Sequence, residues 1–215
     1  MPIITSIEPR KRRQKRFSIF IDEIFFLGVG ENLLQQAHLT VGMEVDPQTL
    51  QALVEKEEYA RAREYLLKLL SRRMYSCQEI RNKLHKREIP ETLAEKLIVD
   101  FQKRKFLDDR QFALDYVENR LRMRPRGIQL LKIELKRKGI DPDLIQEAIQ
   151  PYLGQAEQLE LANQALTKKK NYAGEKDPQK RKRKMAQFLA QKGFPPGVVF
   201  EAIRRKLGAF EEFVE

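Results

Sequence analysis

The chain has 215 residues, of which 41% are apolar and 34% are charged, and its formal net charge is +11 at pH 7. This composition suits thin cores between helices and a large solvated surface, and it argues against a globular enzyme with a deep pocket. No apolar run approaches the roughly 20 residues of a membrane span, and the basic amino terminus lacks the apolar segment of a signal peptide. We therefore expect a soluble, cytoplasmic protein.

The first part of the chain is expected to form a small sheet. Branched and aromatic residues gather in three stretches, which predicts two or three strands at residues 3–7, 17–21 and 24–29. Asp22-Glu23 joins the last two in the manner of a tight hairpin, but Glu23 is a poor residue for a left-handed turn, which favours a longer loop. The basic run Arg10–Arg16 fits either a solvated hairpin tip or a contact with a polyanion. Residues 1–57 are assigned to this β-rich segment with short helices.

The rest of the chain repeats one unit three times: the end of a helix, a turn and the start of a new helix. Shifts of 51 and 54 residues bring apolar residues into register, as in the sets Leu84, Leu135, Leu189 and Ile98, Ile149, Ile203. Gly139 and Gly193 stand where the C-terminus of a helix favours a left-handed residue. Glu88 occupies this position in the first copy, so that helix must end by another route or accept a strained residue.

A repeat of about 50 residues is typical of units that are too small to bury their own apolar face and therefore stack on their neighbours. We expect a mainly α protein, a tandem array of three three-helix repeats that forms an elongated curved body behind the small N-terminal sheet. The repeats are expected at residues 58–107, 108–153 and 154–215, the last with a lysine-rich insertion.

Capping residues mark the starts of several of these helices. Ser76-Cys77-Gln78-Glu79 has the pattern of a capping box, and Asp108 is expected to cap the first helix of the second repeat. The Asp108-Asp109 pair is therefore better explained as a helix cap than as acid–base carboxylates. In the third repeat, a polar stretch from Lys168 to Lys184 separates the first helix from a second helix expected at residues 185–192.

Positive charge is concentrated in three segments. Residues 1–16 carry a net charge of +5, residues 120–138 carry +7 and residues 168–184 carry +7, whereas the remainder of the chain carries −8. Three separate basic segments on a mildly acidic body favour contact with a polyanion over general solubility.

Four arginines alternate in the central basic segment, at Arg120, Arg122, Arg124 and Arg126. With this spacing they cannot share one face of a helix, and we expect them to fan outward. The planar guanidinium suits phosphate and carboxylate alike, so the cluster fits nucleic acid or an acidic protein groove; a solvated helix end that complements its own dipole is the alternative. The run Lys180–Lys184 fits either such a contact or a mobile linker. The candidate residues for binding a partner or DNA are Arg120, Arg122, Arg124, Arg126, Lys132, Lys136, Arg137, Arg12, Arg13, Lys15, Lys180 and Arg181.

No combination of residues suggests catalysis. The sequence contains no Gly-rich phosphate loop, no cluster of metal ligands and no serine or cysteine placed beside a histidine. Cys77 is the single cysteine, which excludes an internal disulfide, and its register with Ile128 predicts buried packing. His38 and His85 are expected at the surface or at an interface, because neither has a second ligand-type residue at metal spacing. We therefore expect a protein that is not an enzyme and that uses no cofactor and no metal.

Four segments carry a resemblance through their order and spacing. They are Arg16-Phe17-Ser18-Ile19-Phe20-Ile21-Asp22, Leu69-Leu70-Ser71-Arg72-Arg73, Leu107-Asp108-Asp109-Arg110-Gln111-Phe112-Ala113 and Leu135-Lys136-Arg137-Lys138-Gly139-Ile140. Each is a structural cap or turn, but together they are specific, and over nearly the whole chain they resemble the bacterial RecX family. Glu88 in place of the usual glycine and the lysine-rich insertion of the third repeat depart from the family pattern.

The resemblance implies a non-enzymatic regulator of the RecA recombinase, which lies in the helical groove of the RecA filament on DNA and restrains its ATP hydrolysis, strand exchange and co-protease activity. An array of three-helix units can span several filament subunits, and we expect it to act as a monomer. A direct DNA-binding module is the alternative, since three-helix units with a short turn resemble helix-turn-helix domains. A helical adaptor for another protein is a third interpretation.

Overall fold

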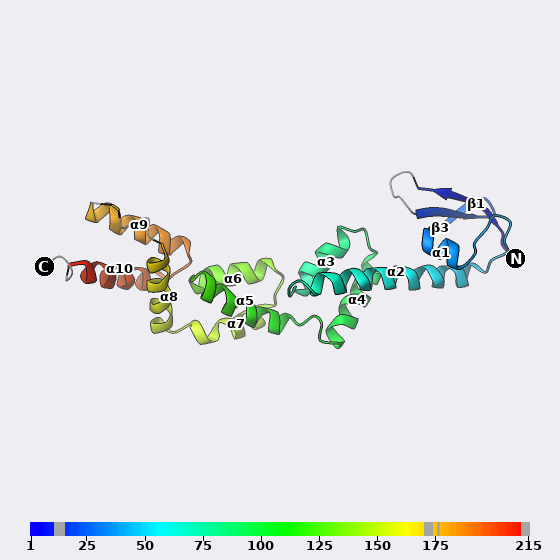
Figure 1. Cartoon of the computed structure of the whole chain (residues 1–215). Helices are drawn as coiled ribbons and strands as arrows, with labels where there is room; N and C mark the ends of the chain where they lie inside the picture. Colours follow the sequence, from blue (N-terminus) through cyan, green and yellow to red (C-terminus); the bar gives the residue numbers. More distant parts are fainter. Residues whose placement is uncertain (11–15, 170–173, 176, 212–215) are drawn as a thin grey trace. The chain divides into compact units, whose positions relative to one another are not determined.

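The computed structural model describes residues 1–10, 16–169, 174–175 and 177–211. The fold divides into two compact units, one formed by Met1–Arg72 and Ile89–Leu93 and the other by Arg73–Glu88 and Ala94–Glu215. The described residues form three strands and ten α-helices, and Figure 1 labels the helices and strands β1 and β3. The predicted combination of a small N-terminal sheet with a mainly helical remainder is therefore confirmed.

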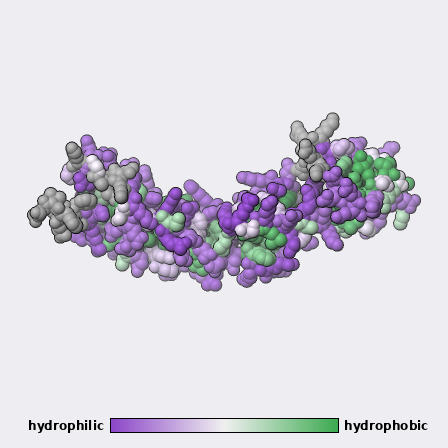
Figure 2. Space-filling model, in the orientation of Figure 1, coloured by the Kyte–Doolittle hydropathy of each residue, from purple (hydrophilic) through white to green (hydrophobic). Residues whose placement is uncertain are grey.

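The first unit is built on an antiparallel sheet in the order β1-β2-β3, with β1 at Ile4–Pro9, β2 at Arg16–Ile21 and β3 at Ile24–Gly30. The short helix α1 (Glu31–Gln36) and the start of α2 (Pro47–Leu70) share one apolar core with the sheet. Ile24 and Phe25 remain exposed, and Figure 2 shows apolar surface gathered over this sheet.

The hairpin between β2 and β3 has a two-residue turn, so the prediction of a longer loop was wrong. Ile21 pairs with Ile24, and the two turn residues Asp22 and Glu23 both take positive φ, at 48° and 67°. Residues in β1 and directly before it hold this strained turn in place. The backbone N–H of Glu23 donates to Thr5 Oγ1 at 2.8 Å, and that of Asp22 donates to the carbonyl oxygen of Ile3 at 3.1 Å.

Helix α2 begins at an aspartate cap and runs without interruption to Leu70. The side chain of Asp46 accepts hydrogen bonds from the backbone N–H groups of Gln48 and Thr49, and Pro47 occupies the first turn. The boundary expected between residues 57 and 58 therefore lies inside one continuous helix.

The second unit contains the remaining helices and one core that joins most of them. They are α3 (Cys77–His85), most of α4 (Glu91–Lys103), α5 (Asp109–Met123), α6 (Ile128–Arg137), α7 (Pro142–Ile149), the short 3-10 helix Gln150–Tyr152, α8 (Gln155–Lys168), α9 (Pro178–Gln191) and α10 (Pro196–Glu211). Buried residues of α5 through α10 form a single apolar cluster that includes Leu135 and Leu189. The second and third repeats therefore share one core.

The turns and caps expected from the repeat are present. Ser76 and Glu79 form a reciprocal capping box at α3, and the Asp108 side chain accepts from the backbone N–H groups at the start of α5. Gly139 and Gly193 take positive φ, at 75° and 81°, and Glu88 takes the same conformation with φ of 57°. Of the two possibilities for Glu88, the strained residue is thus the one observed.

Helix α9 begins at Pro178, seven residues before the position expected from the sequence. Asp177 caps it by accepting from the backbone N–H groups of Gln179 and Lys180. The interpretation of Lys180–Lys184 as a mobile linker was therefore wrong, because these residues lie in the first turns of a capped helix. The signal, an aspartate followed by proline, was present in the sequence.

Candidate functional site at the junctions between repeats

The start of α3 meets the turn between α6 and α7, and this contact forms the first junction between repeats. The hydroxyl of Ser76 donates to the backbone carbonyl of Lys138 at 2.7 Å. The next residue, Gly139, lies directly against Gln78, and a Cβ atom at this glycine would overlap the side chain of Gln78. Glycine is needed at this turn both for its positive φ and for the close approach.

The second junction repeats this arrangement between α6 and the turn that joins α9 to α10. The backbone N–H of Gly127 donates to the carbonyl of Lys192 at 2.8 Å. A Cβ at Gly193 would lie 2.6 Å from the backbone nitrogen of Leu130. In the register of the repeat, Gly127 corresponds to Ser76 and Lys192 corresponds to Lys138, so equivalent residues make both contacts.

A second hydrogen bond strengthens each junction. The backbone N–H of Cys77 donates to Asp109 Oδ1 at 2.8 Å, and that of Ile128, its equivalent, donates to Gln158 Oε1 at 3.4 Å. Both acceptors come from the first turn of the helix that opens the following repeat. Asp109 therefore serves the adjacent helix α3, while its neighbour Asp108 caps its own helix.

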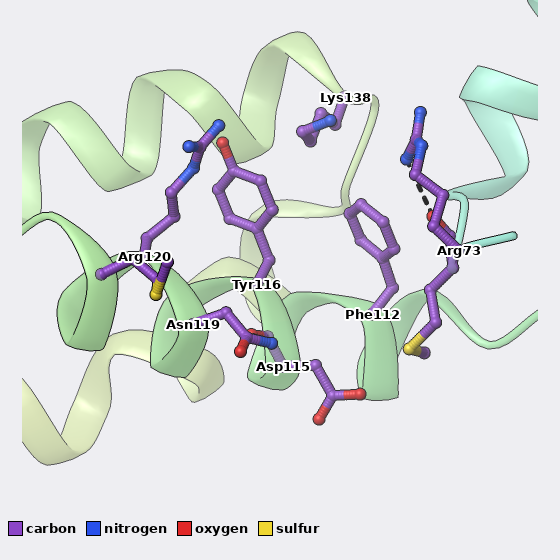
Figure 3. Close-up of a pocket in the computed structure, with 9 residues that line it drawn as sticks. Arg73, Phe112, Asp115, Tyr116, Asn119, Arg120 and Lys138 are labelled. Carbon is purple, nitrogen blue, oxygen red and sulfur yellow. Dashed lines mark hydrogen bonds between the residues drawn. The ribbon is translucent and has the colours of Figure 1, made fainter.

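A hollow of about 490 Å³ opens at the first junction, and we call it the first junction hollow. Figure 3 shows Phe112 and Tyr116 projecting from α5 with Arg120 and Lys138 beside the Tyr116 ring. The two rings are stacked with centroids 5.9 Å apart, and Lys138 Nζ lies 5.1 Å from the Tyr116 centroid. The lining residues are Arg73, Met74, Phe112, Asp115, Tyr116, Asn119, Arg120, Met123 and Lys138.

Carboxylates neutralise the cations of the first junction hollow. Glu79 accepts from Lys138 Nζ at 2.7 Å and from Arg73 at 3.2 Å. Burial alone would raise the pKa of Glu79, but the hydrogen bonds from Lys138 and Arg73 outweigh it and hold that pKa below its ordinary value. Glu79 therefore stays ionised and balances both cations.

Glu134 has the same role on the other side of this hollow. It accepts a hydrogen bond from the Tyr116 hydroxyl at 2.9 Å, and its Oε2 lies 3.8 Å from Arg120 Nε. Burial raises the pKa of Tyr116, and the hydrogen bond to Glu134 adds to this effect against the opposing influence of Arg120. The phenol therefore remains a hydrogen-bond donor at neutral pH.

A hollow of about 360 Å³ opens at the second junction, and we call it the second junction hollow. It occupies the equivalent place in the repeat, since Arg124 corresponds to Arg73 in the 51-residue register and Lys192 corresponds to Lys138 in the 54-residue register. Lys169 directly follows α8, and Arg120 of the first hollow lies near the end of α5, the equivalent helix. Its lining residues among the described part of the chain are Met123, Arg124, Pro125, Ala165, Lys168, Lys169, Phe188 and Lys192. Met123 lines both hollows, so the two lie next to each other.

The four alternating arginines separate into two groups. Arg122 and Arg124 are exposed at the end of α5, whereas Arg120 is half-buried beside Tyr116. Arg126 is only 7% exposed because its guanidinium contacts Glu134 and its Nε donates to the carbonyl oxygen of Arg124 at 3.3 Å. The expected outward fan is therefore wrong for Arg126, which has a structural role.

The other candidate residues are spread over two helices of the second unit. On α6, Lys136 and Arg137 are exposed and Lys132 is half-buried. On α9, Lys180 is exposed, while the Arg181 guanidinium donates to the backbone carbonyl of Glu175 at 2.8 Å. None of these five residues is among those that line the two hollows. Arg12, Arg13 and Lys15 lie outside the described residues.

Sequence reasoning missed the lysines that line the hollows. Lys138 and Lys192 both precede the glycine of a repeat turn, so the 54-residue register pairs them. Lys168 and Lys169 stand at the end of α8, as Asn119 and Arg120 stand near the end of α5. Comparing polar residues between repeats, and not only the apolar ones, identifies Lys138 and Lys192.

The described residues contain no group of three or more histidine, cysteine, aspartate or glutamate side chains able to hold a metal ion. Among the helices that the structure describes, none is long and apolar enough to cross a lipid bilayer. His38 and His85 are exposed and Cys77 is buried, as expected. What the junctions present is a repeated arrangement of cations beside aromatic rings, which suits binding of an anionic partner.

Comparisons with known proteins match four segments of the chain to one family. The matching models are the Regulatory protein RecX N-terminal domain at residues 2–46 and the first, second and third RecX three-helix domains at residues 62–100, 108–149 and 156–203. Regulatory protein RecX of Bacillus velezensis is 32% identical over 208 residues, an alignment that covers 95% of this chain and 78% of the relative. Regulatory protein RecX of Oceanobacillus iheyensis is 30% identical over 210 residues, and the alignment covers 95% of this chain and 77% of the relative.

Solved structures show the same relationship. A crystal structure of regulatory protein RecX superposes with a TM-score of 0.65 at 27% identity and covers 95% of this chain and all of the other. RecX from Lactobacillus salivarius shares the fold, with a TM-score of 0.61 at 22% identity over 70% of this chain and 97% of its own. The relatives are named as regulatory proteins. With its N-terminal sheet, its three-helix repeats and these relatives, the chain belongs to the RecX family of regulatory proteins.

Proposed function

We propose that this protein is a non-enzymatic, cytoplasmic regulator that binds the RecA filament on DNA as a monomer. In this role it restrains the ATPase, strand-exchange and co-protease activities of the filament. Membership of the RecX family supports a regulatory role. The observation that carries the proposal is the recurrence, at two successive repeat junctions, of a hollow lined by cations beside aromatic rings.

A repeated site suits a repeated partner. A filament of identical subunits on DNA presents the same acidic and phosphate groups at regular intervals, and two equivalent hollows can engage two of them at once. Linked contacts raise the overall affinity through effective concentration, without any single strong contact. The exposed residues Arg122 and Arg124 lie at the end of α5, beside both hollows, and add positive charge that steers an anionic partner.

The direct test measures ATP hydrolysis by RecA filaments on single-stranded DNA with increasing amounts of this protein. We expect the steady-state rate to fall as the protein is added, and to fall less at high salt because the contacts are electrostatic. An unchanged rate at a protein concentration above that of RecA would contradict the proposal.

A direct DNA-binding module is the second candidate, and the lysine-lined second junction hollow favours it. The two functions differ in their dependence on the recombinase. A DNA-binding module binds bare duplex DNA with an affinity that falls steeply with salt, whereas a filament regulator needs RecA for tight binding. Affinity for bare duplex equal to the affinity for the filament, at the same salt concentration, would favour the second candidate.

A further inference from the structure

The two junction hollows occupy equivalent places but differ in their balance of charge. Both carboxylates that neutralise the first junction hollow have apolar counterparts at the second. Glu79 corresponds to Leu130 in the 51-residue register, and Glu134 corresponds to Phe188 in the 54-residue register. The second junction hollow therefore retains the cations of its counterpart and lacks the acidic groups that offset them.

Four cations line the second junction hollow. Lys168 Nζ is held at the end of α5, where it donates to the backbone carbonyls of Arg122 at 3.0 Å and Met123 at 3.5 Å. Lys169 Nζ and Lys192 Nζ lie 4.2 Å and 5.5 Å from the centre of the Phe188 ring. The fourth cation is the exposed Arg124. None of the four forms an ion pair with another residue that the structure describes.

The pKa of Lys192 reflects the resulting repulsion. This half-buried ammonium group has a pKa below its ordinary value, first because burial disfavours its charge and then because Arg126, Arg124 and Lys169 repel it. Glu134 opposes these effects, but its influence is the smallest of the five. Its carboxylate contacts Arg126 and accepts from the Tyr116 hydroxyl. An anion placed among the four cations would remove this unfavourable interaction.

We propose that the second junction hollow is a binding site for a phosphate group, either free or within the phosphodiester backbone of a nucleic acid. Three of the four cations are lysines, which act as point charges and accept phosphate without a fixed geometry, whereas carboxylates of a protein partner are better matched by the paired donors of arginine. The hollow of about 360 Å³ has room for a phosphate group together with a neighbouring sugar.

This site would serve the proposed function by holding the DNA of a filament. That role of the site rests on the proposed function. The test uses the isolated protein without recombinase, so that each proposal can fail alone. Binding is measured by titration calorimetry with inorganic phosphate, with an oligodeoxythymidylate of about ten nucleotides, and with an acidic peptide of similar net charge. The test variant is Lys169→Gln with Lys192→Gln, and circular dichroism checks its helical content.

The matched control removes two exposed cations from α9 as Lys182→Gln with Arg183→Gln. We expect the test variant to bind the oligonucleotide about tenfold more weakly than the control does. For the test variant, the slope of log affinity against log salt concentration should also become shallower. The change should be about 0.7 for each phosphate of the single strand that the variant no longer neutralises. Should the test variant fail to fold, Lys169→Gln alone keeps the comparison possible.

The arms of the experiment distinguish the sources of the phosphate. Weakened binding of both inorganic phosphate and the oligonucleotide supports a site for the phosphodiester backbone, and weakened binding of inorganic phosphate alone supports a site for the free anion. Equal affinities of test and control variants for both phosphate ligands overturn the proposal. So does an acidic peptide that binds more tightly than either ligand and is released by the same two substitutions, because the site would then recognise carboxylates.

Discussion

The hydroxyl of Ser76 donates a hydrogen bond to the backbone carbonyl of Lys138, 62 residues further along the chain. The same oxygen accepts from the backbone N–H of Glu79 at 3.1 Å, so one side chain caps α3 and ties the first repeat to the second. Ser76 is fully buried, and removal of its hydroxyl takes a hydrogen bond from both of these half-buried partners.

Ser76→Ala should therefore lower the free energy of unfolding by about 2 to 3 kcal/mol, the sum of a lost N-cap and a half-buried carbonyl that loses its donor. Urea denaturation followed by circular dichroism measures the change. Thr167→Ala is the control, since this exposed hydroxyl donates only to a carbonyl within its own helix, and its effect should stay within about 0.5 kcal/mol. Equal effects of the two substitutions would show that the bond across the junction contributes nothing.

Alanine substitutions at three glycines distinguish the effect of backbone strain from that of steric overlap at the first junction. Gly139 has positive φ and no room for a Cβ, Gly42 has positive φ with open space around it, and Gly197 has open space without positive φ. We expect Gly139→Ala to destabilise the fold by about 2 to 4 kcal/mol, Gly42→Ala by about 1 kcal/mol, and Gly197→Ala to be neutral or slightly stabilising. Thermal melts rank the variants, and a different order would contradict the close contact with Gln78.

The buried thiol of Cys77 gives a prediction for pH dependence. Burial, with added repulsion from Asp109, raises its pKa from 9.0 to about 12. Because the folded state holds the proton more tightly, the contribution of this group to stability is complete below pH 9 and is lost as the pH rises from 9 toward 12. The thiol should react slowly with a maleimide at pH 7 in the native protein and rapidly in denaturant. Fast native labelling would show that it is accessible.

Local signals predicted the elements well, and the misses at the junctions share one physical cause. Ser76, Asp108 and Gly139 act within one turn of their own helix, so their roles as caps could be predicted from neighbouring residues. The burial of Arg126 depends on Glu134, which lies further along the chain on α6, and a count of charges cannot reveal that pairing. The hydrogen bond from Ser76 to Lys138 is set by how one repeat packs on the next.

The start of α9 is a different kind of miss. Asp177 and Pro178 are a standard helix start, but the surrounding lysines resemble a linker and the local cap was overlooked. The hairpin turn at Asp22-Glu23 could not be predicted from its own residues, which are unfavourable for a tight turn. Hydrogen bonds to residues around β1, distant in the sequence, hold it in place.

The arginines at the end of α5 separate the binding surface from the structural core. Reversal of two exposed charges, as Arg122→Glu with Arg124→Glu, should leave the circular dichroism and the melting temperature nearly unchanged, because exposed charges contribute little to stability. Arg126→Glu should instead unfold the junction, since it places a second carboxylate beside Glu134 in a buried site, at a cost of about 3 kcal/mol or more.

Inhibition of the RecA ATPase should weaken by about tenfold or more in the Arg122→Glu, Arg124→Glu variant, which corresponds to about 1.4 kcal/mol of interaction with the filament. Lys182→Glu with Arg183→Glu makes the same change of charge on α9, at residues that do not line the hollows, and should weaken inhibition less. The comparison matters because any reduction of positive charge slows association with a polyanion, whereas only a local contact depends on which charges are reversed. Equal weakening in the two variants would mean that the partner responds to net charge alone. Full inhibition by the first variant with its fold intact would place the functional surface elsewhere and leave Arg122 and Arg124 as a solvated helix end.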